Sequence, residues 1–333
     1  MKPRRRRLRE PAWTRLDDEA LLDMRLCDLR LSLARSGLDQ AVLRLYEELR
    51  LKGIRFRPHV WLSEEWFSPD GVPGIAVPFF LAHPRLQRLE RRFMHEVEGG
   101  NDKWLMRILR HETGHAIDTA FGLRRRKTWR DTFGKASRRY PSRYSPRPAS
   151  RRFVLHLGHW YAQSHPTEDF AETFAVWLPR NSRWRSQYTG WPALRKLEYV
   201  DVTMRNLHGR RAACLNREVV EPLAENTRTL REHYRRKQRR YELNTARTYD
   251  RRLLRVFGTA ALYTTLNLYI MDYIQKRELV RTEPIRLVFG GVSWTFGPIL
   301  GMYVSERVGT PVACALASFI ALLLLAYVAY SVY

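Results

Sequence analysis

The feature that most constrains this chain is the pattern His-Glu-X-X-His at residues 111–115, in a segment that we predict to be helical. Residues four apart on an α-helix project from one face, so His111 and His115 can reach the same metal ion. Glu112 then lies beside a ligand, where it can take a proton from a metal-bound water whose pKa Zn²⁺ lowers from about 15.7 towards roughly 7. The alternative is that the pattern occurs by chance on a solvent-facing helix. A third ligand elsewhere in the chain is needed to favour the metal site over this alternative.

A zinc site of this kind has three protein ligands and one open position. The candidate segment for the third ligand is 165–178, where Pro166 suits a first helical turn and aromatic residues recur at the spacing of a half-buried helix. Glu168 and Glu172 lie four apart on it, where like charges repel unless a positive group lies beside them. We predict that Glu168 is the third ligand and that Glu172 orients a ligand histidine through its other ring nitrogen. The alternative is an ordinary amphipathic helix with acidic residues near its N-terminus.

Other residues near these two motifs are weaker candidates. Tyr161 lies seven residues before Glu168, and its phenol could donate a hydrogen bond to the oxyanion of a tetrahedral intermediate, although a packed aromatic is the alternative. A metzincin pattern would need a histidine where this chain has Phe121, and Asp118 is expected to cap or form a salt bridge. Three further histidines are left as polar groups, pocket contacts or residues without a role: His156, His159 and His165.

Three segments carry a resemblance to a known family: RHETGHAID at 110–118, WYAQSHPTEDFAETFAVWL at 160–178 and GWPALRKLEYVD at 190–201. They resemble bacterial zinc-binding metallopeptidases, a gluzincin-like family, and the resemblance extends over about residues 12–254. The ExxxE helix is also similar to that of the anthrax-lethal-factor-like zincins.

The resemblance implies an α+β, zincin-like fold and hydrolysis of peptide bonds. It implies that His111, His115 and Glu168 bind zinc and that Glu112 is the general base. Tyr161 matches the tyrosine that assists in the toxin-like relatives. The family supplies no substrate, so the substrate-binding residues are unknown.

Composition indicates a globular enzyme with additions. A chain of 333 residues with 44% hydrophobic content can hold one sizeable domain and an appendage. Cys27, Cys214 and Cys314 are far apart and show no CxxC spacing, so we expect neither a disulfide framework nor a thiolate zinc site. The basic N-terminus is followed by no apolar core of the kind a signal peptide needs. We therefore expect the peptidase region to be cytoplasmic.

The net charge of +25 comes mostly from arginine runs at 4–7, 124–127 and 235–240. Such a field attracts acidic polypeptides, anionic lipid headgroups or nucleic acid. No helix-turn-helix or zinc-finger spacing accompanies the charge, which makes nucleic acid the less favoured partner. The alternative is that the arginines reflect a GC-rich genome and cover solvated faces.

Apolar spacing predicts two helices within 17–51 and strands at 54–62 and 74–81. The strand at 74–81 is a candidate for pairing with an extended substrate, or else a core strand. We expect an exposed loop at 122–150 that could border the cleft, and a long charged helix at 218–252.

The C-terminal residues, from about 255 onwards, contain long apolar stretches. The stretches 287–304 and 311–333 carry no charge and are candidate membrane spans, whereas 257–274 is weaker. Residues from about 262 to 333 resemble a fragment of a major facilitator transporter. We interpret this tail as an anchor or a fusion remnant that forms a two-span hairpin, with helices packed in a soluble core as the alternative.

The predicted organisation is a basic arm at 1–11, a zincin-like metallopeptidase domain at 12–205, a charged helical connector at 206–254 and hydrophobic membrane-associated helices at 255–333.

We therefore predict a zinc metallopeptidase tethered to the inner face of a membrane. One alternative is a non-catalytic metal-binding regulatory or interaction protein that uses its basic surface. Another is a membrane-complex subunit with a vestigial zincin domain.

Overall fold

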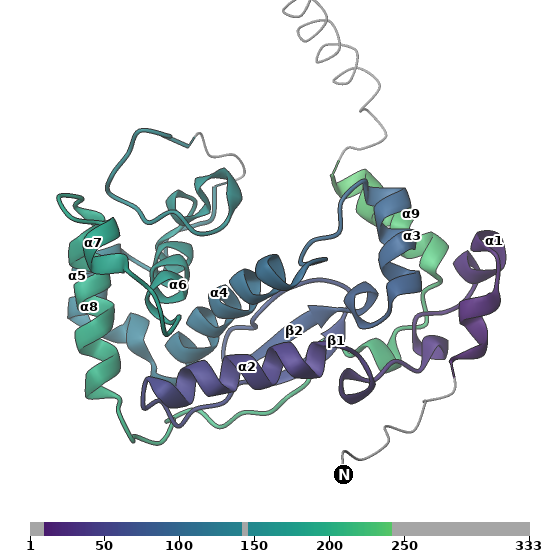
Figure 1. Ribbon diagram of the computed structural model, residues 1–333, viewed down its shortest axis with the longest axis horizontal. Helices are drawn as coiled ribbons and strands as arrows, with labels where there is room; N and C mark the ends of the chain where they lie inside the picture. Colours follow the sequence, from purple (N-terminus) through teal and green to yellow (C-terminus); the bar gives the residue numbers. More distant parts are fainter. Residues whose placement is uncertain (1–9, 142–145, 242–333) are drawn as a thin grey trace, which may run out of the picture. The chain divides into compact units, whose positions relative to one another are not determined.

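The computed structural model describes residues 10–141 and 146–241, which lie in one compact unit assigned to Met1–Asn244. This part of the chain is rich in helices and has one small sheet, in agreement with the predicted α+β class at a coarse level (Figure 1). Its α-helices are α1 (Asp18–Leu22), α2 (Leu38–Leu51), α3 (Pro84–Met94), α4 (Asp102–Phe121), α5 (Lys127–Phe133), α6 (Pro166–Trp177), α7 (Trp184–Gln187), α8 (Ala193–Asn206) and α9 (Leu230–Arg240). Its strands are β1 (His59–Ser63) and β2 (Gly74–Pro78), and its 3₁₀ turns are η1 (Ala12–Arg15), η2 (Cys27–Leu29), η3 (Leu33–Arg35), η4 (Phe79–Ala82), η5 (Leu123–Arg125), η6 (Gly158–Gln163) and η7 (Leu223–Glu225).

The two active-site candidate helices, α4 and α6, pack against each other near the middle of the unit. In Figure 1, α5, α7 and α8 lie on the same side of α4 as α6, and α1, α3 and α9 lie on the other. A Cβ atom at Gly114 of α4 would lie 2.7 Å from the Cα atom of Ala171 in α6. Only glycine permits this approach, because no larger residue leaves room for the backbone of the neighbouring helix.

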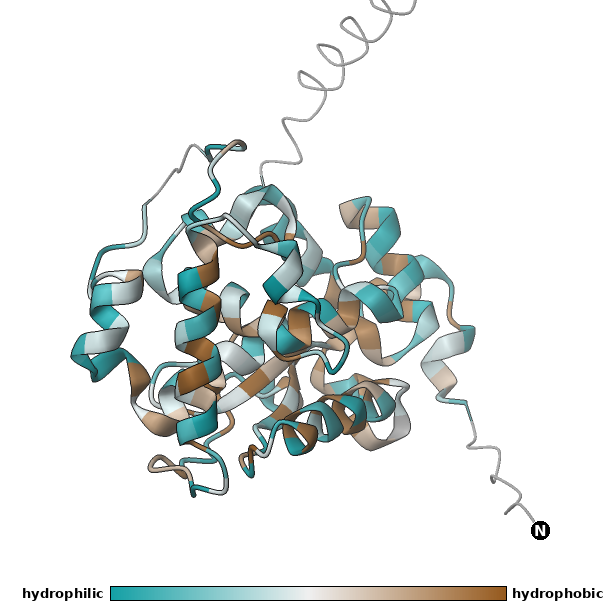
Figure 2. Cartoon of the chain, turned by 60° about the vertical axis from the view of Figure 1, so that its left-hand side comes forward, coloured by the Kyte–Doolittle hydropathy of each residue, from teal (hydrophilic) through white to brown (hydrophobic). Residues whose placement is uncertain are grey.

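A continuous hydrophobic core surrounds these helices. Figure 2 shows hydrophobic residues gathered on the inward-facing sides of the elements and hydrophilic residues on the outside. All 12 residues of α6 are buried. The prediction of a half-buried helix was therefore wrong, because α6 packs against α4, α5, α8 and η6. Its carboxylates are consequently away from bulk water, where they need partners.

The strands β1 and β2 pair in parallel, with His59 opposite Gly74. The connection between them folds back along the outer edge of β2, where the Ala76 N–H donates to the Phe67 carbonyl at 2.8 Å and the Ser68 hydroxyl donates to the Gly74 carbonyl at 2.7 Å. Of the two alternatives for this strand, pairing with substrate or a core strand, the structure favours the core strand, because all five residues of β2 are buried and the chain's own residues pair with its outer edge.

Two predicted helices are shorter than expected, for one shared reason. The Leu26 N–H donates to the Arg228 carbonyl, and the Cys27 N–H donates to the Asn226 carbonyl. This pairing ends the first helix of the 17–51 region at Leu22, whereas its second helix forms as α2. It also keeps residues 226–229 out of the helix predicted at 218–252. The helix α9 begins at Leu230, after a capping box formed by Thr229 and Glu232.

The described part of the predicted connector, 206–241, contains the last residue of α8 and is otherwise helical only in η7 and α9, and α9 packs against α3 and α1. Within residues 10–141 and 146–241, no helix is long and apolar enough to cross a membrane. The predicted membrane-associated segment at 255–333, with its transporter-like stretch, lies outside the described residues. So does Cys314, whereas Cys27 and Cys214 are free.

Candidate metal centre

The helix α4 carries the two histidines on one face. Its N-cap is Asn101, whose side chain accepts a hydrogen bond from the Trp104 N–H, and it ends at Gly122 in the left-handed conformation. His111 and His115 lie one turn apart, with ring centroids 4.9 Å from each other. The helix therefore aligns two imidazole rings towards one point.

The helix α6 brings a carboxylate to the same point. Its N-cap is His165 and its first turn contains Pro166, as the sequence predicted. Glu168 Oε2 lies 3.1 Å from the Nε2 atom of His111 and 3.1 Å from the Nε2 atom of His115. The two Nε2 atoms are 3.2 Å apart. The three atoms thus form a nearly equilateral triangle.

This triangle fits a zinc ion. Zinc–ligand bonds of about 2.0–2.1 Å in a tetrahedral arrangement separate neighbouring ligand atoms by roughly 3.3 Å. Two imidazoles and one carboxylate are also the ligand set of a catalytic zinc site that keeps one position open. Among the described residues, His111, His115 and Glu168 form the one group of histidine, cysteine or acidic side chains placed to hold a metal ion.

Glu172 fixes the orientation of one ligand. Its Oε1 atom lies 2.8 Å from His111 Nδ1, and its Oε2 atom accepts a hydrogen bond of 2.8 Å from the Leu157 N–H. Because a carboxylate can only accept here, His111 Nδ1 carries the proton and Nε2 is left for a metal. The structure thus places Glu172 where the sequence predicted a residue that orients a ligand.

The close contacts shift the pKa values of these groups. Burial alone would raise the pKa of Glu168, but the two histidines outweigh it and hold the pKa well below its usual range. Burial alone would lower the pKa of His111, but its hydrogen bonds with Glu168 and Glu172 raise the pKa well above its usual value. The site therefore stabilises positive charge where a metal ion would lie.

Glu112 lies beside the ligands and differs from them in having no hydrogen-bond donor to its carboxylate among residues 10–141 and 146–241. The residue is 8% exposed. Burial raises its pKa, while His111 and His115 act in the opposite direction. A carboxylate in this position can accept a proton from a small molecule at the site.

Tyr161 reaches the site from η6. Its ring centroid lies 5.7 Å from that of His111, and its side chain is 36% exposed. Within the part of the chain that the structure describes, its hydroxyl has no hydrogen-bond partner. Burial raises its pKa above the usual value, so the phenol stays protonated and able to donate.

Tyr140 is a site residue that the sequence analysis missed. Its hydroxyl donates to Glu168 Oε1 at 2.7 Å, and its ring stacks on that of His165 at 3.8 Å between centroids. It lies in the segment 122–150, which was predicted to be an exposed loop that could border the cleft. That prediction was wrong for the first part of the segment, which forms η5 and α5 with Trp129 buried, and Tyr140 lies in the loop after α5. No spacing rule connects this loop to Glu168, so the sequence carried no signal for the contact.

Other polar residues near the site have hydrogen-bond or ion-pair partners outside it. Asp118 accepts hydrogen bonds from the backbone and side chain of Arg124, so of the two expected roles, a cap or a salt bridge, it forms the salt bridge. Asp169, next to Glu168, pairs with Lys196 at 2.6 Å, and burial raises its pKa to about 7. His165 caps α6, and His156 donates to the Arg107 carbonyl at 2.9 Å.

Comparison with known proteins agrees with this site. Residues 86–184 match the model of a family described as "Putative zinc-binding metallo-peptidase". The match contains both α4 and α6 but covers less than a third of the chain, and it does not extend to the transporter-like stretch at 262–333. Neither curated proteins nor solved structures gave a match. The match and the geometry together indicate a zinc site and, at a coarse level, a peptidase.

Proposed function

We propose that this protein is a zinc-dependent peptidase that uses water as its nucleophile. The observation that carries the proposal is the convergence of His111, His115 and Glu168 beside the carboxylate of Glu112, to which no described residue donates a hydrogen bond. The family match supports the same activity at a coarse level.

The roles of the side chains follow from their positions. Zinc held by the three ligands would polarise the scissile carbonyl and lower the pKa of a water molecule. Glu112 accepts a proton from the attacking water and passes it to the leaving amine. Tyr161, whose hydroxyl has no hydrogen-bond partner among the described residues, donates a hydrogen bond to the oxyanion. No covalent acyl-enzyme is required.

The decisive experiment compares Glu112→Gln with the wild-type full chain. We expect both to retain about one zinc per chain, whereas hydrolysis of a denatured protein mixture, followed by mass spectrometry, should fall by about 10²–10⁴ in the variant. Glu47→Gln is the matched control, because Glu47 lies on α2 in an exposed pair with Arg50. Wild-type protein without zinc, or a variant as active as the wild type, would refute the proposal.

A second candidate is a non-catalytic metal-binding protein that uses its basic surface to bind an acidic partner. A cavity of about 390 Å³ supports this second candidate. Among the described residues, no acidic side chain lines the cavity, and the arginines that line it have no carboxylate partner. Those arginines are Arg55, Arg57, Arg210, Arg211 and Arg217. Glu112→Gln separates the two candidates, since it should leave binding of an acidic partner intact.

We also propose that the tail at 255–333 tethers a cytoplasmic peptidase domain to a membrane. The support is the uncharged length of 287–304 and 311–333 in the sequence. Cell fractionation should find the full chain in the membrane pellet and a chain truncated after residue 254 in the supernatant. The same distribution for both would refute the tether.

A further inference from the structure

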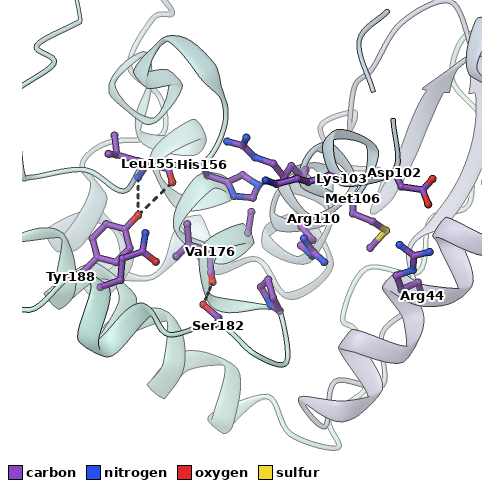
Figure 3. Close-up of a pocket in the computed structure, with 14 residues that line it drawn as sticks. Arg44, Asp102, Lys103, Met106, Arg110, Leu155, His156, Val176, Ser182 and Tyr188 are labelled. Atoms are coloured by element: carbon purple, nitrogen blue, oxygen red, sulfur yellow. Dashed lines mark hydrogen bonds between the residues drawn. The ribbon is translucent and has the colours of Figure 1, made fainter. Parts of the chain in front are cut away.

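A cavity of about 560 Å³ lies between α2, α4 and the segment that runs from α6 to α7. In Figure 3, Arg44, Lys103 and Arg110 lie on the α2 and α4 side, whereas Leu155, Val176 and Tyr188 lie on the other. One wall is therefore cationic and the other largely apolar. A cavity of this volume is in the range of small-molecule sites, which are about 300–1,000 Å³.

Most of the cations on the cationic wall have no anionic partner among the described residues. Arg110 is held by Glu48 in a two-point ion pair. Arg44, Lys103 and Arg107 also line the cavity, and none has an ion pair or side-chain hydrogen bond with any residue in 10–141 or 146–241. Asp102 is the one acidic residue among the described residues that line the cavity. Three cations therefore face a cavity that holds a single opposing charge.

A hydrogen-bonded relay joins this cavity to the metal centre. Leu155 and His156 line the cavity, and His156 is fixed by its bond to the Arg107 carbonyl. The next residue, Leu157, donates its N–H to Glu172, which accepts the Nδ1 proton of His111. A shift of this segment would therefore change the orientation of a zinc ligand.

We propose that the cavity binds a small organic anion, with an acidic head group and an apolar or aromatic body, and that the bound anion alters zinc affinity through Leu157 and Glu172. The cations of α2 and α4 would hold the head group, and the apolar wall would cover the body. The binding itself depends only on the cavity, whereas the coupling rests on the proposed zinc site.

The binding test is a calorimetric titration of the metal-free full chain with naphthalenesulfonate. We expect saturable binding that weakens at least about tenfold in Arg107→Glu. Lys103→Glu serves as a second variant if the first fails to fold. Arg88→Glu on α3 is the matched control, because it makes the same charge change at an exposed residue outside the cavity. Equal binding by Arg107→Glu and Arg88→Glu, or no saturable binding, would overturn the site.

The coupling test repeats the titration with zinc-loaded protein. Linkage requires that an anion which changes zinc affinity is itself bound differently when zinc is present, typically by about 5-fold or more. Glu172→Gln should bind the probe and lose most of that difference, because it breaks the relay. Equal affinity with and without zinc in the wild type would overturn the coupling. A chain that binds the probe but no zinc would refute the peptidase proposal and the coupling while leaving the anion site standing.

Discussion

Glu168 and Glu64 are both glutamates in contact with a histidine, but their other neighbours differ. Glu168 contacts His111 and His115, and no described lysine or arginine pairs with it. Glu64 lies 3.0 Å from the Nδ1 atom of His233, and it also accepts hydrogen bonds from Asn226 and Arg228. The first cluster forms a metal-sized triangle of ligand atoms, whereas the second is an ion-pair network that joins the residue after β1 to α9 and to the segment before it.

The second cluster contains a permanent cation and the first, among the described residues, does not, and this decides which carboxylate is available to a metal ion. Arg228 is a permanent cation, so it neutralises Glu64 and would repel a metal ion. Burial alone would raise the pKa of Glu64, but His233, Asn226 and Arg228 outweigh it and lower the pKa to about 2. In the cluster at Glu168 only histidines supply the positive partner, and a neutral imidazole is itself a metal ligand.

The largest effect should come from removing one carboxylate of each cluster. We expect Glu168→Ala to lose more than about 100-fold in zinc affinity, because it deletes a direct ligand, an effect larger than the loss of a supporting residue. Glu64→Ala should keep about one zinc per chain and lose only stability. The measurement is zinc content of the full chain after dialysis. Equal loss of zinc in both variants would show that the two clusters do not differ in the proposed way.

A smaller loss of zinc affinity is expected from a change at Glu172, which orients the ligand His111. Glu172→Gln keeps the side-chain shape but removes the charge that holds His111 Nδ1. Zinc affinity should fall about 10–100-fold in competition with a chelator. Asp169→Asn is the control, because Asp169 is on the same buried helix but pairs with Lys196. If both variants lose the same affinity, the effect comes from disturbing α6 rather than from His111.

Local spacing explains what could be predicted of this site. His111 and His115 share a helix, as do Glu168 and Glu172, so the helical period alone placed each pair on one face. The fit of the two helices was not predictable in the same way. It depends on Gly114, whose missing side chain lets Ala171 approach, and Gly114 occupies a variable position of the His-Glu-X-X-His motif.

The parts of the fold and of the site that were not predictable depend on contacts between segments far apart in the chain. Tyr140 reaches Glu168 from a loop, and Leu157 reaches Glu172 through a backbone N–H that any residue type could supply. The pairing of residues near Leu26 with Arg228 joins segments about two hundred positions apart and overrides the helical apolar pattern. Periodicity reports on neighbours in the chain, so it carries no information on such contacts. The roles of Glu112 and Tyr161 stay predictions.

The cluster at Glu64 should be visible in the pH dependence of stability. A carboxyl group whose folded pKa is about 2 and whose ordinary value is 4.5 stabilises the fold above pH 4.5 and loses this contribution as the pH falls towards 2. After solvent screening we expect about 1–2 kcal/mol. The measurement is the unfolding free energy of wild type and Glu64→Gln, both metal-free. The difference should shrink between pH 5 and pH 2, and a constant difference would contradict the assignment.

The smallest expected loss of zinc affinity comes from removing the Tyr140 hydroxyl, which donates to the Oε1 atom of Glu168. Tyr140→Phe removes one hydrogen bond to Oε1 but keeps the ring stacked on His165. One such bond on a half-exposed side chain contributes about 0.5–1 kcal/mol, so zinc affinity should fall about two- to fivefold. Tyr161→Phe is the matched control, because the Tyr161 hydroxyl has no hydrogen-bond partner among the described residues. It should keep zinc affinity and lose hydrolysis. The reverse result, with zinc weakened only in Tyr161→Phe, would mean that Tyr140 does not position Glu168 and that Tyr161 belongs to the metal site rather than to the oxyanion.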